Sequence, residues 1–400
     1  MTYPENILYC STLCSEKLLN YIFKSSYRKP LLSTQKFHRL FVAGLRGNEM
    51  KITALSAIPI TRVNHKKKFW INKSETTQDI KYIYIPFINY TFFRQLCIIV
   101  FSCIFSMVWC MKNSKKNSLI ICDILNVSMS TSVLLIGKLF GFKTCGIVTD
   151  LPQYQFKEKK GKHFLIEKAA KEISVKFMRA YDSYVILTEQ MNDIVNPNGK
   201  PFVVIEGLAD IKMGERERPK KDSKLIILYS GGIYEKYGVK NLINAFKNIE
   251  GNDLQLSIYG AGEMESSIAK YCTQDPRIKY FGIVSNDELI EAQQKATLLV
   301  NPRFSKEEYT KYSFPSKNME YLVSGTPALT SSLPGMPKEY LDYFYLIEDE
   351  TEKGIESKLR EILQKSVAEL SDFGEKARRF VIENKNNITQ TEKFLKIFSQ

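Results

Sequence analysis

The chain has 400 residues, enough for two or three domains, and 44% of them are apolar and 12% aromatic, which excludes a disordered or fibrous protein. Its net charge of +14 is unevenly distributed. Residues 1–200 carry 29 Lys and Arg against 13 Asp and Glu, whereas residues 201–400 carry 28 against 30. We therefore expect an anionic partner for the first half, such as nucleic acid, an acidic membrane surface or a phosphorylated lipid.

The cysteines and histidines indicate neither a disulfide framework nor a metal centre. The eight cysteines are dispersed without a C-x-x-C pair, and the sequence has only three histidines. We therefore expect reduced thiols and no metal site. The opening residues, MTYPENILYC, do not form a basic leader followed by an apolar stretch, so a cytoplasmic location is expected.

The first half alternates short β-branched runs with amphipathic helical stretches. Strands are predicted at 7–10, 51–55, 118–122, 144–149, 183–187 and 202–205, and helices at 128–140 and 164–180. The polar stretch 212–224 has no apolar period and is typical of a linker.

The longest apolar run, residues 96–111, lies between Arg94 and Lys112. As a helix, these 16 residues would be about 24 Å long. A helix that spans a bilayer usually has ~20 residues, so this run is short for a spanning helix. Ser102 and Ser106 would share one face of it. A buried or half-buried helix is favoured, an interfacial helix on a membrane is the second alternative, and a spanning helix is the third.

The alternation resumes after the linker. Strands are predicted at 225–230, 255–259, 278–281, 297–300 and 328–331, and helices at 240–248, 264–271, 287–295 and 315–324. Strands separated by helices form parallel sheets with both faces covered, and the chain would hold two of them. The predicted parts are a first domain at 1–210, a linker at 211–224, a second domain at 225–380, and a final helix at 381–400 that packs back on the first domain.

In such a pair of domains, a ligand cleft would lie at the carboxyl ends of the strands, where helix amino ends favour phosphate. Glycines stand at these places in the second half. Gly231 and Gly232 follow one predicted strand, and Gly260 and Gly262 follow the next. Because glycine also ends strands for turn geometry alone, a ligand-facing role and a structural role both stay open.

A short helix is predicted after Pro315, which suits a first turn, with Ser316 as one of two residues that could cap it. Lys317 in that turn opposes the helix dipole, and a bound phosphate would remove this penalty. Glu320, one turn further, could accept hydrogen bonds from the vicinal hydroxyls of a ribose. The alternative is a solvated Lys317 and a Glu320 that forms only an ion pair.

Several stretches of the second half resemble the donor-binding domain of family-four retaining glycosyltransferases. They are IILYSGGIYEKYGVKNL (226–242), SIYGAGE (257–263), IKYFGIVSNDELIEAQQKATLLVNPR (278–303) and FPSKNMEYLVSGTP (314–327). Weaker matches in the first half are FVAGLRG (41–47), GIVTDLP (146–152) and YDSYVILTEQ (181–190). The resemblance implies the α/β GT-B fold, two doubly wound Rossmann-like domains facing each other across a cleft. It also implies a hexosyltransferase that binds a nucleotide sugar, expected to be a UDP-sugar, without a metal or other cofactor.

The resemblance also implies roles for individual residues. Glu320 matches the second Glu of the family's E-x7-E motif, which binds the ribose. Gly231 and Gly232 match the glycine loop that faces the diphosphate. The remaining assignments are Ile283 and Val284 for the base, Arg303 and Lys317 for the diphosphate, and Asp150 for the acceptor side.

Three positions depart from the family pattern. Tyr312 stands where the motif has its first Glu, which contacts the sugar in relatives. Gly232 stands where an Arg is usual, and Lys236 lies one place before the expected Lys, at which a gapless match puts Tyr237. The run Y-S-F-P-S-K resembles a branch that makes capsule or exopolysaccharide.

Under this resemblance, Arg303, Lys317 and Lys236 would stabilise the charge that leaves with the nucleotide diphosphate. Asp150 would orient the acceptor or take its proton, unless it only caps a local turn. The basic first half, including residues 66–68 and 157–160, suits an anionic membrane leaflet bearing a lipid-diphosphate-linked glycan. The protein would then be peripheral on the inner face of the plasma membrane. Solvated lysine-rich loops are the alternative.

Two other functions stay open. A basic nucleic-acid-binding protein is suggested by charge alone, but no nucleic-acid module is recognisable and the second half is nearly neutral, so no nucleic-acid partner is expected. A nucleotide-sugar-binding scaffold without turnover is suggested by the missing first Glu.

Overall fold

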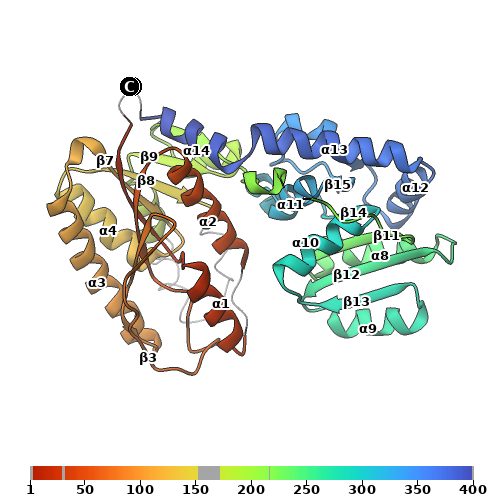
Figure 1. Cartoon of the computed structure of the whole chain (residues 1–400), viewed down its shortest axis with the longest axis horizontal. Coiled ribbons are helices and arrows are strands. Elements are labelled where there is room, and N and C mark those ends of the chain that lie inside the picture. The colour runs from red at the N-terminus through yellow and green to blue at the C-terminus, as the bar shows by residue number, and fades with distance from the viewer. Residues whose placement is uncertain (1–2, 29–31, 152–171, 216, 399–400) are drawn as a thin grey trace. The chain divides into compact units, whose positions relative to one another are not determined.

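The computed structural model describes residues 3–28, 32–151, 172–215 and 217–398, and it divides the chain into two units (Figure 1). The first unit comprises Met1–Leu208 and Asn387–Gln400, and the second comprises Ala209–Asn386. The first domain was predicted to end at 210 and the second at 380. In the structure, the second unit begins at Ala209 and ends at Asn386.

The first unit is built on a sheet of eight strands, counted over the described residues, in the order β10-β9-β8-β7-β1-β2-β5-β4. Neighbouring strands are parallel, except that β4 is antiparallel to β5. The strands are β1 (Asn6–Ser11), β2 (Lys51–Ser56), β4 (Glu75–Thr77), β5 (Ile80–Tyr84), β7 (Ser118–Asp123), β8 (Lys143–Val148), β9 (Ser183–Ile186) and β10 (Phe202–Val204). A separate antiparallel pair joins β3 (Phe69–Trp70) to β6 (Phe87–Ile88).

Helices cover this sheet (Figure 1). They are α1 (Glu16–Ser25), α2 (Leu32–Gly47), α3 (Thr91–Lys112), α4 (Val127–Leu139), α7 (Asn192–Val195) and α14 (Asn387–Lys396), with 3-10 turns η1 (Lys115–Asn117) and η2 (Glu189–Met191). Of the helix predicted at 164–180, residues 164–171 lie outside the described residues, and residues 172–178 are helical as predicted. α14 packs on α2, and a Cβ on Gly44 would lie 2.0 Å from the carbonyl oxygen of Asn387. The end of the chain thus belongs to the first unit.

The apolar run at 96–111 lies on the surface of the first unit. It forms most of α3, a 22-residue helix that is long and apolar enough to cross a membrane. Ser102 and Ser106 share the face that packs inward, as predicted, together with Ile98, Trp109 and Cys110. The opposite face is exposed along the helix, so α3 is half-buried, which is within the favoured alternative.

The second unit contains a parallel sheet of six strands, counted over the described residues, in the order β13-β12-β11-β14-β15-β16. Its strands are β11 (Leu225–Gly232), β12 (Leu254–Ala261), β13 (Ile278–Gly282), β14 (Leu298–Asn301), β15 (Ala328–Ser331) and β16 (Tyr345–Ile347). Its helices are α8 (Val239–Lys247), α9 (Glu265–Gln274), α10 (Asn286–Lys295), α11 (Ser316–Ser324), α12 (Glu352–Leu363) and α13 (Val367–Asn384). The 3-10 turns are η3 (Ile211–Gly214), η4 (Glu235–Tyr237), η5 (Glu308–Tyr312) and η6 (Lys338–Tyr343).

The stretch predicted as a linker is packed onto the second unit. Arg218 donates a hydrogen bond to Glu375 on α13, at 2.6 Å. Lys221 donates to the hydroxyl of Thr326, also at 2.6 Å, and to the carbonyl oxygen of Ala296. The absence of an apolar period in this stretch therefore reflects a polar attachment to the surface of the unit.

Candidate active site

The predicted donor-binding residues lie at the carboxyl ends of the parallel strands in the second unit. β11 ends at Gly231 and Gly232, and α11 begins beside them. The backbone N–H of Ser230 donates to the hydroxyl of Tyr321, at 3.0 Å, which fixes α11 against the end of β11. A Cβ on Gly231 would lie 3.7 Å from Cε of Lys317. The structure thus brings Gly231 and Lys317 together, far apart as they are in the sequence.

The amino end of α11 carries the predicted phosphate and ribose ligands. Pro315 is the residue before the first turn, and Gly325 ends the helix with a left-handed φ of 72°, as the Pro and Gly signals predict. Ser316 in the first turn is exposed. Lys317 Nζ lies 3.6 Å from Glu320 Oε2, and their side chains are 32% and 15% exposed. Because this ion pair is partly exposed to solvent, a diphosphate could replace Glu320 as the partner of Lys317. Glu320 would then be available to accept hydrogen bonds from hydroxyl groups.

A cluster of cations and aromatic rings lies next to this helix. Arg303, after β14, lies over the ring of Tyr237, with Cζ 4.3 Å from the ring centroid, and 5.8 Å from that of Tyr309. Lys236 Nζ lies 5.5 Å from the centroid of Tyr237 and 5.9 Å from that of Tyr309. The structure therefore gathers Arg303 and Lys236 around two shared rings, an arrangement that holds both cations in place.

Polar atoms in this cluster lack partners. Nε of Arg303 and the hydroxyl of Tyr309 are buried without a hydrogen bond among the described residues, as is the hydroxyl of Ser313. Burial raises the pKa of Tyr309, so its hydroxyl keeps its proton. Buried donors of this kind are usually satisfied, which makes the cluster suited to an anionic ligand with several acceptor oxygens.

Sequence reasoning did not single out Tyr309 or the ring of Tyr237 as a support for cations. The available signal was the spacing of aromatic and basic residues within EKY and PRFSKEEY. That signal is weak, because the two segments meet only through the sheet.

Gly260 and Gly262 have a packing reason in the structure. Gly260 has a φ of 124°, and a Cβ there would lie 1.8 Å from the carbonyl oxygen of Gly231. A Cβ on Gly262 would lie 2.2 Å from the carbonyl oxygen of Ile233. Both glycines let β12 approach the end of β11, so they shape the loop that presents Gly231 whether or not they face a ligand.

The predicted base-contacting segment follows β13. Gly282 turns the chain with a φ of 65°, and Ile283 is 60% exposed beyond it, next to the half-buried Val284. Phe281 stacks on Tyr259 with ring centroids 4.6 Å apart. Ile283 thus has an exposed apolar side chain at the same edge of the sheet as Gly231, where the strands have their carboxyl ends.

Tyr312 and Asp150 are the other predicted site residues. Tyr312 is half-buried at the end of η5, which leads into α11. Asp150 belongs to the first unit, where it follows β8, and its Oδ1 accepts a hydrogen bond from the N–H of Leu151, at 2.8 Å. The neighbouring basic run at 157–160 lies outside the described residues.

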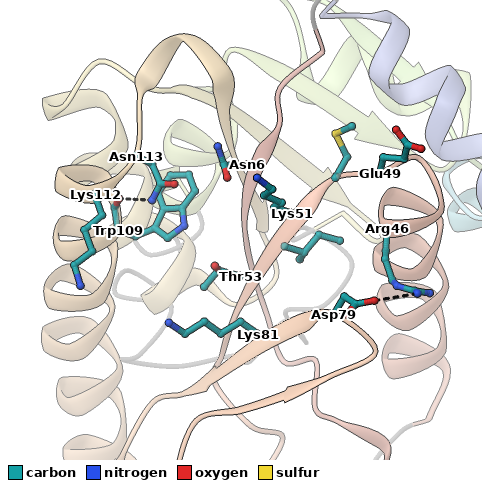
Figure 2. A pocket seen from close by; sticks show the side chains of 12 residues that line it. Asn6, Arg46, Glu49, Lys51, Thr53, Asp79, Lys81, Trp109, Lys112 and Asn113 are labelled. Atoms are coloured by element: carbon teal, nitrogen blue, oxygen red, sulfur yellow. Dashed lines mark hydrogen bonds and ion pairs between the residues drawn. The ribbon is translucent and has the colours of Figure 1, made fainter.

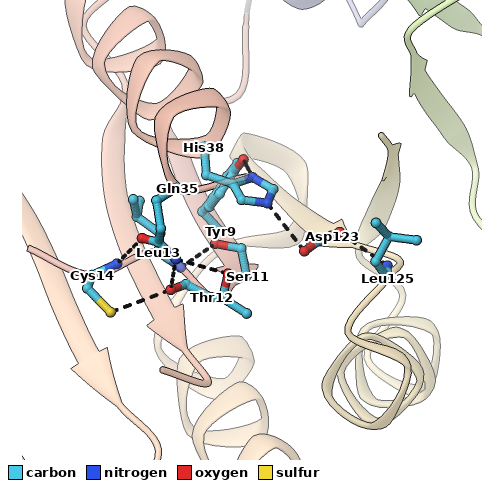
Figure 3. A network of polar contacts seen from close by, with 9 residues as sticks. All are labelled: Tyr9, Ser11, Thr12, Leu13, Cys14, Gln35, His38, Asp123 and Leu125. Carbon is cyan, nitrogen blue, oxygen red and sulfur yellow. Dashed lines mark hydrogen bonds and ion pairs between the residues drawn. The ribbon is translucent and has the colours of Figure 1, made fainter. Parts of the chain in front are cut away.

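The first unit holds a buried polar network that sequence analysis did not predict (Figure 3). The hydroxyl of Tyr9 lies 2.6 Å from Nδ1 of His38, and Nε2 of His38 lies 3.3 Å from Oδ2 of Asp123. Burial, with the charge of Asp123 as a second cause, raises the pKa of Tyr9. A protonated Tyr9 donates to Nδ1, which leaves the N–H at Nε2 to donate to Asp123. The network joins α2 to the carboxyl ends of β1 and β7.

A cavity of about 560 Å³ opens where β1, β2 and β5 of the first unit begin (Figure 2). Its lining includes the cations Arg46, Lys51, Lys81 and Lys112. Arg46 pairs with Asp79 at 3.1 Å. Since the candidate site residues lie at carboxyl ends of strands, this cavity is a separate feature.

The described residues contain no group of three or more His, Cys, Asp and Glu side chains placed to hold a metal ion.

Residues 212–380 match the family model described as glycosyl transferases group 1. No curated protein sequence matches the chain. Among solved structures, the chain is similar to a variant of TarM from S. aureus, solved with fondaparinux, alpha-GlcNAc-glycerol and UDP. The TM-score is 0.52 at 18% identity, over 79% of this chain and 60% of the TarM chain. This chain thus spans less than two thirds of that protein.

Two further structures match nearly end to end. Sucrose-phosphate synthase from Thermosynechococcus elongatus has a TM-score of 0.65 at 13% identity, over 98% of this chain and 99% of its own. HepE from Anabaena, solved with UDP and glucose, has a TM-score of 0.64 at 9% identity, over 99% of both chains. The predicted α/β fold is confirmed: the chain has the GT-B fold, and the match over residues 212–380 supports a glycosyltransferase.

Proposed function

We propose that this protein is a retaining glycosyltransferase of family-four type that moves a hexose from a UDP-sugar to an acceptor in surface glycan biosynthesis. The observation that carries the proposal is the grouping of Arg303, Lys236 and Lys317 around the end of β11, with Glu320 one turn along α11. The UDP in the TarM and HepE structures supports a uridine nucleotide.

The proposed chemistry follows from the charges. When the bond between sugar and diphosphate breaks, negative charge accumulates on the diphosphate oxygens. Cations held in advance stabilise this charge more than mobile ones, because they need no rearrangement during the reaction. The tyrosine rings hold Arg303 and Lys236, and Lys317 adds the third charge. The proposed mechanism uses no metal, and Asp150 is proposed to orient or deprotonate the acceptor hydroxyl.

The proposed acceptor is a lipid-diphosphate-linked glycan or a polysaccharide of the capsule or exopolysaccharide type. The excess of 16 positive charges in residues 1–200 supports an anionic membrane surface as partner, with the protein peripheral on its cytoplasmic side.

The test is a panel of nucleotide sugars, with binding measured by calorimetry and transfer by chromatography on lipid-linked acceptors. We expect UDP-sugars to bind more tightly than GDP-sugars and the product to keep the anomeric configuration of the donor in NMR spectra. Arg303→Ala should lower turnover at least tenfold, whereas Lys295→Ala, an exposed lysine paired with Glu291, should leave it unchanged. Donor binding without transfer to any acceptor would favour a scaffold, and an inverted product would refute the retaining mechanism.

A further inference from the structure

α3 presents an apolar face to the exterior of the first unit. Its exposed side chains recur at helical spacing along the whole helix, from the first turn to the last. They are Phe92, Phe93, Leu96, Ile99, Val100, Ile104, Met107, Val108 and Met111, each at least 39% exposed. We call these side chains the α3 face. A contiguous apolar stripe of this length is unusual on a surface that meets only water.

The polarity of α3 is reversed with respect to an ordinary surface helix. The small polar side chains of Ser102 and Ser106 point inward and are fully buried beside Ile98 and Trp109, whereas most of the large apolar side chains point outward. The hydroxyl of Ser106 donates to the carbonyl oxygen of Ser102, at 2.6 Å, and so needs no water. The outer side of the helix thus carries an apolar surface where a surface helix usually carries a polar one.

The topology sets the orientation of α3 relative to any bilayer. Two strands of the eight-stranded sheet enclose α3 in the chain: β5, which pairs with β2 and is followed by the short β6, and β7, which pairs with β1. α3 also packs along α4, and Ser128 donates to Gln95 across this contact, at 2.7 Å (Figure 1). Because both ends of α3 return to one sheet, the helix lies along the unit and can enter a membrane only in the plane of its surface.

Cations flank the α3 face at both ends. At its amino end, Arg62 lies 4.9 Å from the ring centroid of Tyr90, and the lysines at 66–68 are exposed beside it. The same loop exposes Phe69 and Ile71, at 60% and 79%. At the carboxyl end, α3 finishes with Lys112, and Lys115 and Lys116 follow it.

The charge of this region selects the partner. Between residues 80 and 149 the sequence has seven basic residues and one acidic residue, Asp123, which is buried in the network with His38. Two copies of this chain joined through α3 would bring like charges together, which is unfavourable. An anionic bilayer complements both the cations and the apolar side chains.

We propose that the α3 face inserts into the interface of an anionic lipid bilayer, with the helix parallel to the membrane plane and the flanking cations on lipid headgroups. This deepens the membrane partner of the proposed function, because it adds apolar insertion to electrostatic attraction. It is independent of sugar transfer.

The test is flotation of the full-length protein with vesicles of phosphatidylcholine, with and without phosphatidylglycerol. We expect binding to the anionic vesicles that persists when salt is raised after binding. A triple variant of the α3 face, Val100→Gln, Ile104→Gln and Val108→Gln, should bind at least tenfold more weakly, because these side chains lose apolar burial in the bilayer. The matched control is Leu225→Gln with Val367→Gln, exposed apolar residues of the second unit, and should bind as the wild type does.

A charge variant separates the two contributions. Lys66→Gln with Lys68→Gln should slow or weaken capture by anionic vesicles, but leave the salt-resistant fraction that the α3 face supplies. Complete release of the wild-type protein by salt, or wild-type binding by the triple variant, would overturn the proposal. So would a dimer in sedimentation experiments without lipid that the triple variant dissociates, since a second copy would then cover the face. UDP affinity, measured on the same samples, shows whether the donor site fails independently.

Discussion

Glu320 occupies a position from which a carboxylate can bind ribose hydroxyls, because it is 85% buried beside Lys317 and one turn from the amino end of α11. We expect Glu320→Ala to weaken UDP binding by about 10–150-fold, the loss of a hydrogen bond to a charged acceptor, about 1.5–3 kcal/mol. Calorimetry measures this, with Glu291→Ala on α10 as the control. An analogue that lacks both ribose hydroxyls should show a much smaller effect, and unchanged UDP affinity in folded Glu320→Ala would exclude the assignment.

Tyr312 replaces the acidic residue that contacts the sugar in the family it resembles, and it stands half-buried just before α11. If its hydroxyl contacts the donor sugar, Tyr312→Phe should lower turnover while UDP affinity stays nearly constant, since the nucleotide is held by other residues. Tyr312→Glu restores the acidic residue of the family motif, but it should not raise turnover above that of the wild type, because the residues around position 312 do not match those of relatives. Turnover, affinity and melting temperature on both variants distinguish this from a core role, in which Phe is tolerated and Glu destabilises the fold.

The residues that could be predicted are those whose signals are local. Pro315 and Gly325 bound a helix by their own backbone preferences, and the helix at 315–324 was expected within one residue of its observed start. The cation–aromatic cluster could not be predicted, because Tyr237, Arg303 and Tyr309 meet only after β11 and β14 pair. The network of Tyr9, His38 and Asp123 could not be predicted either, because its members come from β1, α2 and β7 and meet only in the folded unit.

At the scale of elements, β11 to β15 of the second unit follow from their β-branched runs, but β16 and, in the first unit, α1, α2 and β5 were not predicted. α1 and α2 are amphipathic, so the signal that was missed is the helical spacing of their apolar residues. The sequence predicted a buried or half-buried helix for α3, but not which of its faces would be covered. Apolarity alone does not tell whether a helix is covered by protein or by lipid.

The connection between α9 and β13 contains an ion pair between Asp275 and Arg277. Asp275 ends α9, and Arg277 donates to both of its carboxylate oxygens, at 3.0 and 2.7 Å. These hydrogen bonds hold the pKa of Asp275 below its ordinary value. A lowered carboxyl pKa contributes stability that is present above the unfolded pKa and is lost as the pH falls through the folded pKa.

We therefore expect Asp275→Asn to lower the free energy of unfolding by about 1–3 kcal/mol at neutral pH and by less in acid, below the ordinary pKa of an aspartate. Urea denaturation at neutral pH and near pH 3 measures the difference. Asp253→Asn serves as a control in the same unit. An equal loss at both pH values would mean that the ion pair does not contribute to the acid dependence.

At the scale of the whole molecule, the chain passes from the first unit to the second after Leu208 and returns after Asn386. Each unit has its own buried apolar core among the described residues, including a cluster around β1 and β7 in the first unit and clusters around β11 and β14 in the second. α14 contributes Phe394 and Leu395 to the first of these, so the core of the first unit needs the last residues of the chain. A fragment that ends near residue 207 would lack them.

At Gly44, α2 comes close to α14: an added Cβ would lie 2.0 Å from the carbonyl oxygen of Asn387 and 2.6 Å from Oγ1 of Thr391. The atom in the way, the carbonyl oxygen of Asn387, belongs to the backbone of α14 and can move aside only if the helix moves. We therefore expect Gly44→Ala to destabilise the first unit by about 2 kcal/mol or more. Gly47→Ala is the matched control on the same helix. Its Cβ would meet only the flexible side chain of Ile388, at 3.0 Å. Thermal unfolding of both variants decides the matter. If Gly44→Ala melts no lower than Gly47→Ala, α14 is not held against α2 as the structure shows, and the first unit does not depend on the end of the chain.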